Sequence, residues 1–433
     1  MKLIEKKYPY MKESVFYGKV DNGLTVILLP KVDFHETYGI LTTNFGGIHT
    51  RFTLANGNSV VYPAGIAHFL EHKLFETENE EDIMNEFAKL GASANAYTSF
   101  RQTSYLFSTT QKVLESLSLL QSFVREPYFT EDNVEREQGI IEQEIEMYQD
   151  DADYRLFTGI LSSLYPESPL AYDIAGTVES IAAITADDLH ENFDVFYHPS
   201  NMNLFVIGNF DLEAVWKQIS SYQAAQMDNP AQMDNPAQSF ELAGVPKLPI
   251  QEHLSEQFEV STPKLAVGLR GNDEVDKETI QKYRLSLQFL FAMLFGWTSK
   301  RYQQLYEQGK IDSSFQFQLE VTPEYHYLII SGDTQEPITL SSILMKALRK
   351  FEDDADVTED HLQLLKNEMY GDFIRSLNSL EFTASHFVSH YSEYENVFDI
   401  PQMIQSLQLD DIREAGRRFI DHCDMTDFTI FPK

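Results

Sequence analysis

GIAHFLEHKLF, residues 65–75, is the most informative stretch of this 433-residue chain, and at its centre stands HFLEH, residues 68–72. Histidines four residues apart lie on the same face of an α-helix, so His68 and His72 can both bind one zinc ion. Glu71 flanks that face and can contact a metal-bound water. The spacing H-x-x-E-H is the mirror of H-E-x-x-H, and both are typical of catalytic zinc sites. The alternative is that the two histidines cap an amphipathic helix.

Composition limits the classes of function. With a formal net charge of −34 and a pI of about 4.6, the chain is not expected to follow a phosphate backbone or an anionic membrane. Cys423 is the single cysteine, which excludes an internal disulfide and a thiolate zinc cage and favours a reducing compartment. Residues 1–16 have neither the apolar core of a signal peptide nor the arginines of a transit peptide. The longest apolar run, residues 289–297, is too short to span a bilayer. We therefore expect a cytoplasmic protein without nucleic-acid or membrane partners.

A tandem hexapeptide divides the chain. Residues 225–236 read AQMDNPAQMDNP, a polar segment without apolar periodicity that is typical of a linker or an exposed loop. A chain of this length is expected to hold two domains or more. We place an N-terminal domain with the metal site at residues 1–224, a linker at 225–239 and a C-terminal domain at 240–433. Alternatively the repeat binds a ligand, although two copies are too few to stack.

Strands and helices are mixed in both parts. Apolar runs around Asn22-Gly23 predict a hairpin of residues 15–20 and 24–29. The first part has further expected strands at 38–44, 92–107 (a pair) and 203–208, and expected helices at 65–90 (continuous or interrupted), 111–125 and 131–149. The second part has expected strands near 264–269 and 325–331, and expected helices near 277–295, 340–351 and 359–379. This mixture predicts the α+β class, with helices on one face of a largely antiparallel sheet in each domain.

The helix expected at residues 131–149 offers candidates for the third ligand that a catalytic zinc site needs. At about 100° per residue, Glu137 and Glu144 fall inside the apolar arc of the helix and are nearly superposed. Other glutamates of this helix fall on the solvated side: Glu135, Glu142 and Glu146. Burying a carboxylate costs several kcal/mol unless a cation or a strong donor accompanies it. A zinc ion and its histidines would supply both; the alternative is a boundary position from which the carboxylates reach water.

Together these segments resemble the pitrilysin/insulinase family of inverted-motif (HxxEH) zinc metallopeptidases, which includes mitochondrial processing peptidase, and within it the YmfH-like bacterial branch. GIAHFLEHKLF resembles the family signature, and VEREQGIIEQEI, residues 134–145, resembles its second motif. AGTVESI at 175–181 and YHPSNMNLFVIGNFD at 197–211 resemble further family segments. The resemblance covers the first half of the chain well and the second half only in general character.

The resemblance implies roles for individual residues. It implies that His68, His72 and Glu144 bind Zn²⁺ and that Glu137 orients a ligating histidine. It implies that Glu71 takes a proton from the zinc-bound water and later passes it to the leaving amine. It also implies two homologous α+β domains, the second without zinc, and pairing with a second chain to enclose a chamber.

The resemblance also implies that a peptide substrate adds as a strand to a sheet edge beside the zinc. The matching segment is Ser93–Thr98, where Asn95 and Ala96 would touch the substrate backbone; any sheet strand could carry such residues, so a purely structural role is an equal alternative. The second half departs from the family, which usually offers an Arg followed seven residues later by a Tyr. In QQLYEQGKIDSSF the Arg position is Tyr306, and the Tyr position is Ser313 or Ser314.

Arg301 is close to the expected Arg position but out of register. We therefore hypothesise that a homologous partner subunit supplies the Arg–Tyr pair, with a homodimer as the alternative. His386 and His390 are also four residues apart, but Ser389 stands where Glu71 stands in HFLEH, so we interpret them as surface or interface histidines. The predicted function is a zinc metalloendopeptidase acting on short or unfolded peptides. The alternative is a non-catalytic scaffold subunit that keeps the peptidase fold.

Overall fold

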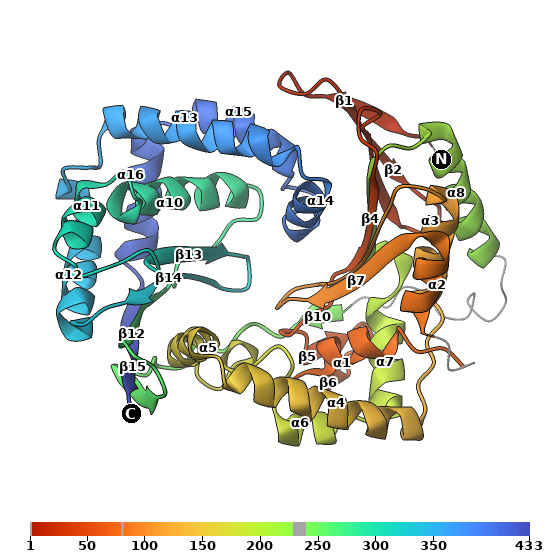
Figure 1. The fold of residues 1–433 in the computed structure, drawn as a ribbon, viewed down its shortest axis with the longest axis horizontal. Helices are drawn as coiled ribbons and strands as arrows, with labels where there is room; N and C mark the ends of the chain where they lie inside the picture. The colour runs from red at the N-terminus through yellow and green to blue at the C-terminus, as the bar shows by residue number, and fades with distance from the viewer. Residues whose placement is uncertain (1, 79–81, 228–239) are drawn as a thin grey trace. The chain divides into compact units, whose positions relative to one another are not determined.

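The computed structural model describes residues 2–78, 82–227 and 240–433 (Figure 1). Most of the AQMDNP repeat, residues 228–236, lies outside these described residues. The chain forms two compact units, each drawn from separated segments. Unit 1 comprises Met1–Ile145, Asp173–Ala243 and Ser376–Ser389; unit 2 comprises Glu146–Tyr172, Gly244–Arg375 and His390–Lys433. The domain boundaries expected from the sequence stay a prediction.

Unit 1 is built on a seven-stranded sheet whose outer strands are β1 and β7. Neighbouring strands are antiparallel except for β3 and β9, which run parallel. All residues of β4 are buried, because both faces of the sheet are covered at this strand. The strand order is β1 (Ile4–Lys7), β2 (Ser14–Lys19), β3 (Thr25–Pro30), β9 (Met202–Gly208), β4 (Thr37–Thr43), β8 (Thr103–Thr109) and β7 (Ala92–Thr98).

The main apolar core of unit 1 lies between one face of this sheet and a layer of helices. Helix α14 (Leu380–Ser389) packs on the other face at β4 and β9, where Phe387 stacks on Phe205 with 4.7 Å between ring centroids. A small sheet joins β10 (Phe240–Leu242), β5 (Arg51–Leu54) and β6 (Ser59–Val61). Among the described residues of unit 1, the remaining helical elements are α1 (Ile66–Lys73), α2 (Ile83–Leu90), α3 (Val113–Phe123), α4 (Glu131–Gln149, which runs on into unit 2), α6 (Val178–Ala182), α7 (Ala186–Phe196), α8 (Leu212–Met227) and a 3₁₀ turn at Pro199–Asn201.

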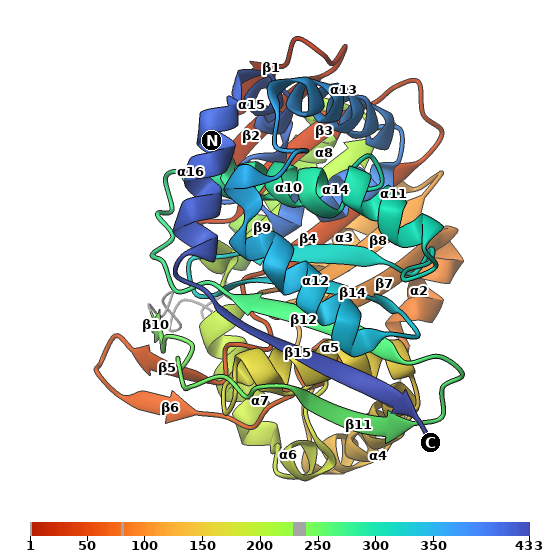
Figure 2. The same cartoon turned by 90° about the vertical axis from the view of Figure 1, so that its left-hand side faces the viewer.

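Unit 2 is built on a five-stranded sheet, drawn face-on in Figure 2. Its order is β11 (Leu254–Phe258), β15 (Asp424–Pro432), β12 (Lys264–Arg270), β14 (His326–Asp333) and β13 (Gln316–Val321). Only β11 and β15 are parallel among these pairs. On one face β12 is covered by α5 (Ala152–Leu164), so closely that a Cβ on Gly268 would lie 2.7 Å from Ile160.

The other face of this sheet packs on the second apolar core. The helices of that layer are α10 (Ile280–Phe295), α11 (Lys300–Glu307), α12 (Pro337–Arg349), α13 (Glu359–Ser376), α15 (Ile400–Ser406) and α16 (Leu409–Ile420). Three 3₁₀ turns complete unit 2, at Pro169–Ala171, Phe351–Asp353 and Val397–Asp399. Among the helices of the described residues, none has the length and hydropathy that a membrane span requires.

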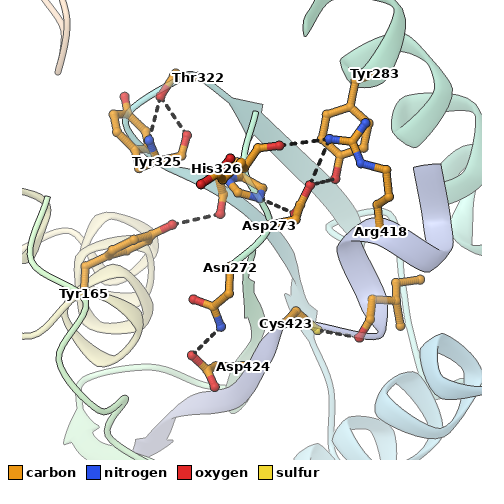
Figure 3. A network of polar contacts seen from close by, with 12 residues as sticks. Tyr165, Asn272, Asp273, Tyr283, Thr322, Tyr325, His326, Arg418, Cys423 and Asp424 are labelled. Atoms are coloured by element: carbon orange, nitrogen blue, oxygen red, sulfur yellow. Dashed lines mark hydrogen bonds and ion pairs between the residues drawn. The ribbon is translucent and has the colours of Figure 1, made fainter. Parts of the chain in front are cut away.

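A polar network joins elements of unit 2 around Asp273 (Figure 3). The Asp273 carboxylate accepts hydrogen bonds from the hydroxyl of Tyr283 on α10, at 2.9 Å, and from the guanidinium of Arg418 on α16, at 3.3 Å. Its other oxygen lies 2.7 Å from Nε2 of His326 on β14. Burial raises the pKa of Asp273, but the hydrogen bond and charge of His326, with Tyr283 and Arg418, lower it below its ordinary value overall. The network therefore ties one strand to two helices.

The predicted α+β class is confirmed, with a largely antiparallel sheet and a main helical layer in each unit. The helix predicted at residues 131–149 is α4, and the one predicted at 65–90 is interrupted into α1 and α2. The prediction of a helix to residue 379 was wrong: α13 ends at Ser376 and α14 begins at Leu380. His386 lies on α14, where its ring stacks on Phe382 with 5.5 Å between centroids.

Candidate metal centre

The start of α1 is fixed by a close approach between two glycines. Gly65 precedes α1 with φ of 92°, a left-handed conformation that costs a side chain about 1–2 kcal/mol. A Cβ there would lie 2.4 Å from the carbonyl oxygen of Ala175. The reverse contact is as close: a Cβ on Gly176 would lie 2.5 Å from the carbonyl oxygen of Ala64, next to Gly65. The segment around residue 175 thus packs against the residue before α1 and limits where this helix, which carries HFLEH, can begin.

Two histidines of α1 face a glutamate of α4. The rings of His68 and His72 are 4.5 Å apart between centroids. The Glu144 carboxylate points to both: its Oε1 lies 3.7 Å from Nε2 of His68, and its Oε2 lies 3.5 Å from Nε2 of His72. Two ligands about 2.1 Å from a tetrahedral zinc ion would lie about 3.4 Å from each other. The spacing of these atoms therefore fits a zinc ion between them.

Glu137 accounts for the orientation of His72. Its side chain is 6% exposed, and its Oε1 lies 3.0 Å from Nδ1 of His72. Burial lowers the pKa of His72, but the hydrogen bond and charge of Glu137 raise it above its ordinary value overall. A Nδ1–H donated to Glu137 leaves Nε2, the atom that faces Glu144, with a free lone pair.

His68 is held neutral by its surroundings. Burial, reinforced by the neighbouring His72, lowers the pKa of His68 to about 3. Its Nδ1 is buried and finds no hydrogen-bond partner among the described residues. A neutral imidazole is the form that binds a metal ion. In the part of the chain that the structure describes, His68, His72 and Glu144 are the group of His, Cys, Asp or Glu side chains that could hold one.

Glu71 is buried on the same helix as His68 and His72, and its carboxylate is hydrogen-bonded to a different element, β7. Its Oε2 accepts a hydrogen bond of 2.5 Å from the hydroxyl of Thr98, the last residue of β7. Burial raises the pKa of Glu71 to about 7, although the Thr98 hydrogen bond opposes this. A carboxyl group with a pKa near 7 can take up and release a proton at neutral pH.

Asn95 and Ala96 lie on β7, an outer strand of the unit 1 sheet. The backbone N–H of Ala96 donates to Oδ1 of Asn95 at 2.9 Å. Within the described residues β7 pairs only with β8, so its other edge has no strand partner. The structure thus places the predicted substrate segment at a sheet edge whose last residue, Thr98, contacts Glu71.

The positions predicted to lack the Arg–Tyr pair lie in unit 2. Tyr306 is exposed on α11. Arg301 donates to the carbonyl oxygen of Leu294 and pairs with Asp354, so its guanidinium is used within the unit. The Ser314 hydroxyl bonds to the side chain of a nearby aspartate, Asp312.

Two polar residues that the sequence analysis did not single out lie at the centre, Thr98 and Lys73. Thr98 gave no signal, because its contact with Glu71 depends on tertiary structure. Lys73 could have been noticed in the sequence, because it is a charged residue directly after HFLEH and before the apolar pair Leu74-Phe75, at a position where a core residue is expected. Its side chain is fully buried.

Comparisons with known proteins identify the family of the chain. The family model for insulinase (peptidase family M16) matches residues 60–178, and that for the peptidase M16 inactive domain matches residues 183–369. The chain is 38% identical over 436 residues to YmfH, an uncharacterized zinc protease of Bacillus subtilis, covering 99% of both proteins. It is 29% identical over 162 residues to the beta subunit of the mitochondrial-processing peptidase of Caenorhabditis elegans, covering 36% of this chain and 35% of that one. A crystal structure from Alicyclobacillus acidocaldarius, described as an M16-like peptidase, aligns with a TM-score of 0.91 at 30% identity over 98% of this chain and 99% of that one.

Proposed function

Because the chain belongs to the insulinase family of peptidases (peptidase family M16), we propose that it is a zinc-dependent endopeptidase that hydrolyses short or unfolded peptides. One observation carries the proposal: His68, His72 and Glu144 converge from two helices at the spacing of zinc ligands. A zinc ion held there supplies Lewis acidity for water and for the scissile carbonyl.

The chain's own residues divide the remaining work. Glu137 fixes the tautomer of His72 through Nδ1. Thr98 occupies Oε2 of Glu71, which leaves Oε1 to take a proton from the attacking water and give it to the leaving amine. A peptide that adds as a strand at β7 would be held by its backbone, beside Asn95 and Ala96. This mode of binding suits short or unfolded peptides, because most of their backbone N–H and C=O groups are not already paired within a folded structure.

We further propose that a homologous partner subunit completes the site with an Arg and a Tyr. The support is local: Tyr306 stands at the expected Arg position, and Arg301 is held by Leu294 and Asp354 in its own unit. The test is peptide cleavage by the purified chain alone and mixed with a candidate partner. Equal rates with and without the partner contradict this part of the proposal.

Glu71→Gln tests the catalytic assignment. The variant should retain zinc and lose cleavage, because Gln keeps the shape of Glu71 and cannot accept the proton. Glu142→Gln, an exposed position on α4, is the matched control and should cleave as the wild type does. Cleavage that survives Glu71→Gln contradicts the mechanism. A zinc-loaded wild-type chain that cleaves no unfolded peptide, alone or with a partner, would favour the scaffold alternative.

A further inference from the structure

Lys73 is a buried cation directly after the second histidine of HFLEH. Its side chain is 0% exposed. Its Nζ lies 2.6 Å from Oε2 of Glu76 and 3.7 Å from Oε2 of Glu137, and it donates to the carbonyl oxygen of Asn133 at 3.3 Å. A lysine is almost never fully buried unless it is paired. The contacts of Lys73 therefore bear on what its charge does there.

The two oxygens of Glu137 are shared between Lys73 and a candidate metal ligand. Oε1 faces Nδ1 of His72 at 3.0 Å, and Oε2 faces the Lys73 ammonium. The direction of Oε2 thus limits the direction of Oε1, because both belong to one planar carboxylate. On its far side Lys73 is tied to Glu76, which also lies 3.8 Å from the Arg136 guanidinium.

Charge balance gives Lys73 a second reason to be there. Around the candidate metal centre lie three carboxylates, those of Glu71, Glu137 and Glu144, and two imidazoles. Lys73 brings a buried ammonium group to within 3.7 Å of one of these carboxylates, that of Glu137. A buried carboxylate that loses its cation is strongly destabilised where it stands.

We propose that Lys73 is a positioning residue of the metal centre, acting on His72 through Glu137. The inference rests on the proposed function only in taking His68, His72 and Glu144 as zinc ligands. The competing explanation is that Lys73 merely fastens α1 to α4 through Asn133, in which case its effect on metal affinity would not pass through Glu137.

The test is the zinc dissociation constant, measured by competition with a chelator on the metal-free full chain. Four proteins are compared: wild type, Lys73→Met, Glu137→Gln and the double variant. Lys73→Met should weaken zinc binding about 10-fold or more, the range found for groups that orient a metal ligand. The double variant should bind as Glu137→Gln does, because Lys73 has no carboxylate left to position. Lys89→Met is the matched control, since Lys89 also pairs with a glutamate three residues away, Glu86, but is 67% exposed; its zinc affinity should not change.

Each outcome decides a different claim. Lys73→Met with wild-type affinity overturns the inference, and so does a double variant that binds more weakly than Glu137→Gln by the full factor of Lys73→Met. Should Lys73→Met fail to fold, as judged by circular dichroism, Lys73→Gln takes its place in the same comparison, because it also removes the charge and keeps a hydrogen-bond donor. Wild-type zinc affinity in Lys73→Gln then overturns the inference in the same way. A wild-type chain that binds no zinc overturns the metal centre itself, a result that no Lys73 variant can produce.

Discussion

Replacing Glu71 with Gln should stabilise the metal-free protein at neutral and alkaline pH, and hardly at all at acidic pH. Burial raises the pKa of Glu71 from an ordinary 4.5 to about 7. Between these values the unfolded chain has released its proton while the native chain still holds it. The wild type therefore loses stability as pH rises through this window, and the loss is complete above about pH 7. A gap of about 2.5 pH units at about 1.4 kcal/mol per unit amounts to between about 3 and 4 kcal/mol.

Gln isolates the ionisation because its carbonyl oxygen can still accept the hydrogen bond of Thr98. The chain has two tryptophans, Trp216 on α8 of unit 1 and Trp297 in unit 2. Trp297 is 66% exposed, so Trp297→Phe is a mild change that leaves Trp216 fluorescence to report the unfolding of unit 1. Urea unfolding in the presence of a chelator then gives the free energy of unfolding at each pH.

The expected gain from Glu71→Gln is under about 0.5 kcal/mol at pH 4.5 and about 3 kcal/mol at pH 8. Glu142→Gln, at an exposed position of the neighbouring helix α4, should show no such dependence on pH. A gain that stays constant across this range, or that shrinks as pH rises, would refute the reasoning that Glu71 is a buried carboxyl with a raised pKa.

Three further changes test other parts of the structure. Thr98→Val should lower kcat about tenfold with KM and zinc content unchanged, because Oε2 of Glu71 loses the hydrogen bond that holds it. Thr98→Ser keeps the hydroxyl and should restore the rate. An equal loss in both variants would indicate a packing effect instead. Asp273→Asn should lower the free energy of unfolding of unit 2 by about 1–3 kcal/mol, followed by Trp297 fluorescence, because it replaces the charged acceptor that Tyr283, His326 and Arg418 share. Wild-type stability would contradict the role of the network. Gly65→Ala should destabilise unit 1 by more than about 2 kcal/mol, measured by urea unfolding, because it places a Cβ on a residue with left-handed backbone angles and makes that Cβ clash with Ala175. An unchanged stability would contradict the argument that this close approach fixes the start of α1.

Periodic features of the sequence carried over into the structure. The apolar stripe of residues 131–149 predicted a helix with Glu137 and Glu144 on its inner side, and α4 has these bounds with Glu137 buried and Glu144 half-buried. Glu135, Glu142 and Glu146 are exposed, as predicted from their angular positions around the helix. Ile140, an apolar residue of the same helix, is exposed as well. Local periodicity sufficed here because one helix buries one stripe against one core.

Contacts between distant segments could not be read in this way. Nothing in residues 380–389 indicates that α14 packs on β4 and β9, some 170 residues or more earlier in the chain. The hydrogen bond from Thr98 to Glu71 likewise depends on how β7 approaches α1. Lys73 is a partial exception, because at four residues after Phe69 and three after Leu70 it falls on the apolar face of the helix, where a charged residue requires a buried partner. The sequence does not identify Glu137 as that partner.

Zinc binding by the metal-free chain is the most direct test of the proposal that His68, His72 and Glu144 form a metal centre. Equilibrium dialysis against zinc, followed by metal analysis, would compare the wild type with Glu144→Gln and with Glu146→Gln, an exposed control on the same helix. We expect one tightly bound zinc ion per chain in the wild type and in Glu146→Gln. Glu144→Gln should lose more than the 10- to 100-fold in affinity typical of residues that merely orient a ligand. Tight zinc binding that survives in Glu144→Gln, or a wild-type chain that binds none, would contradict the proposed metal centre.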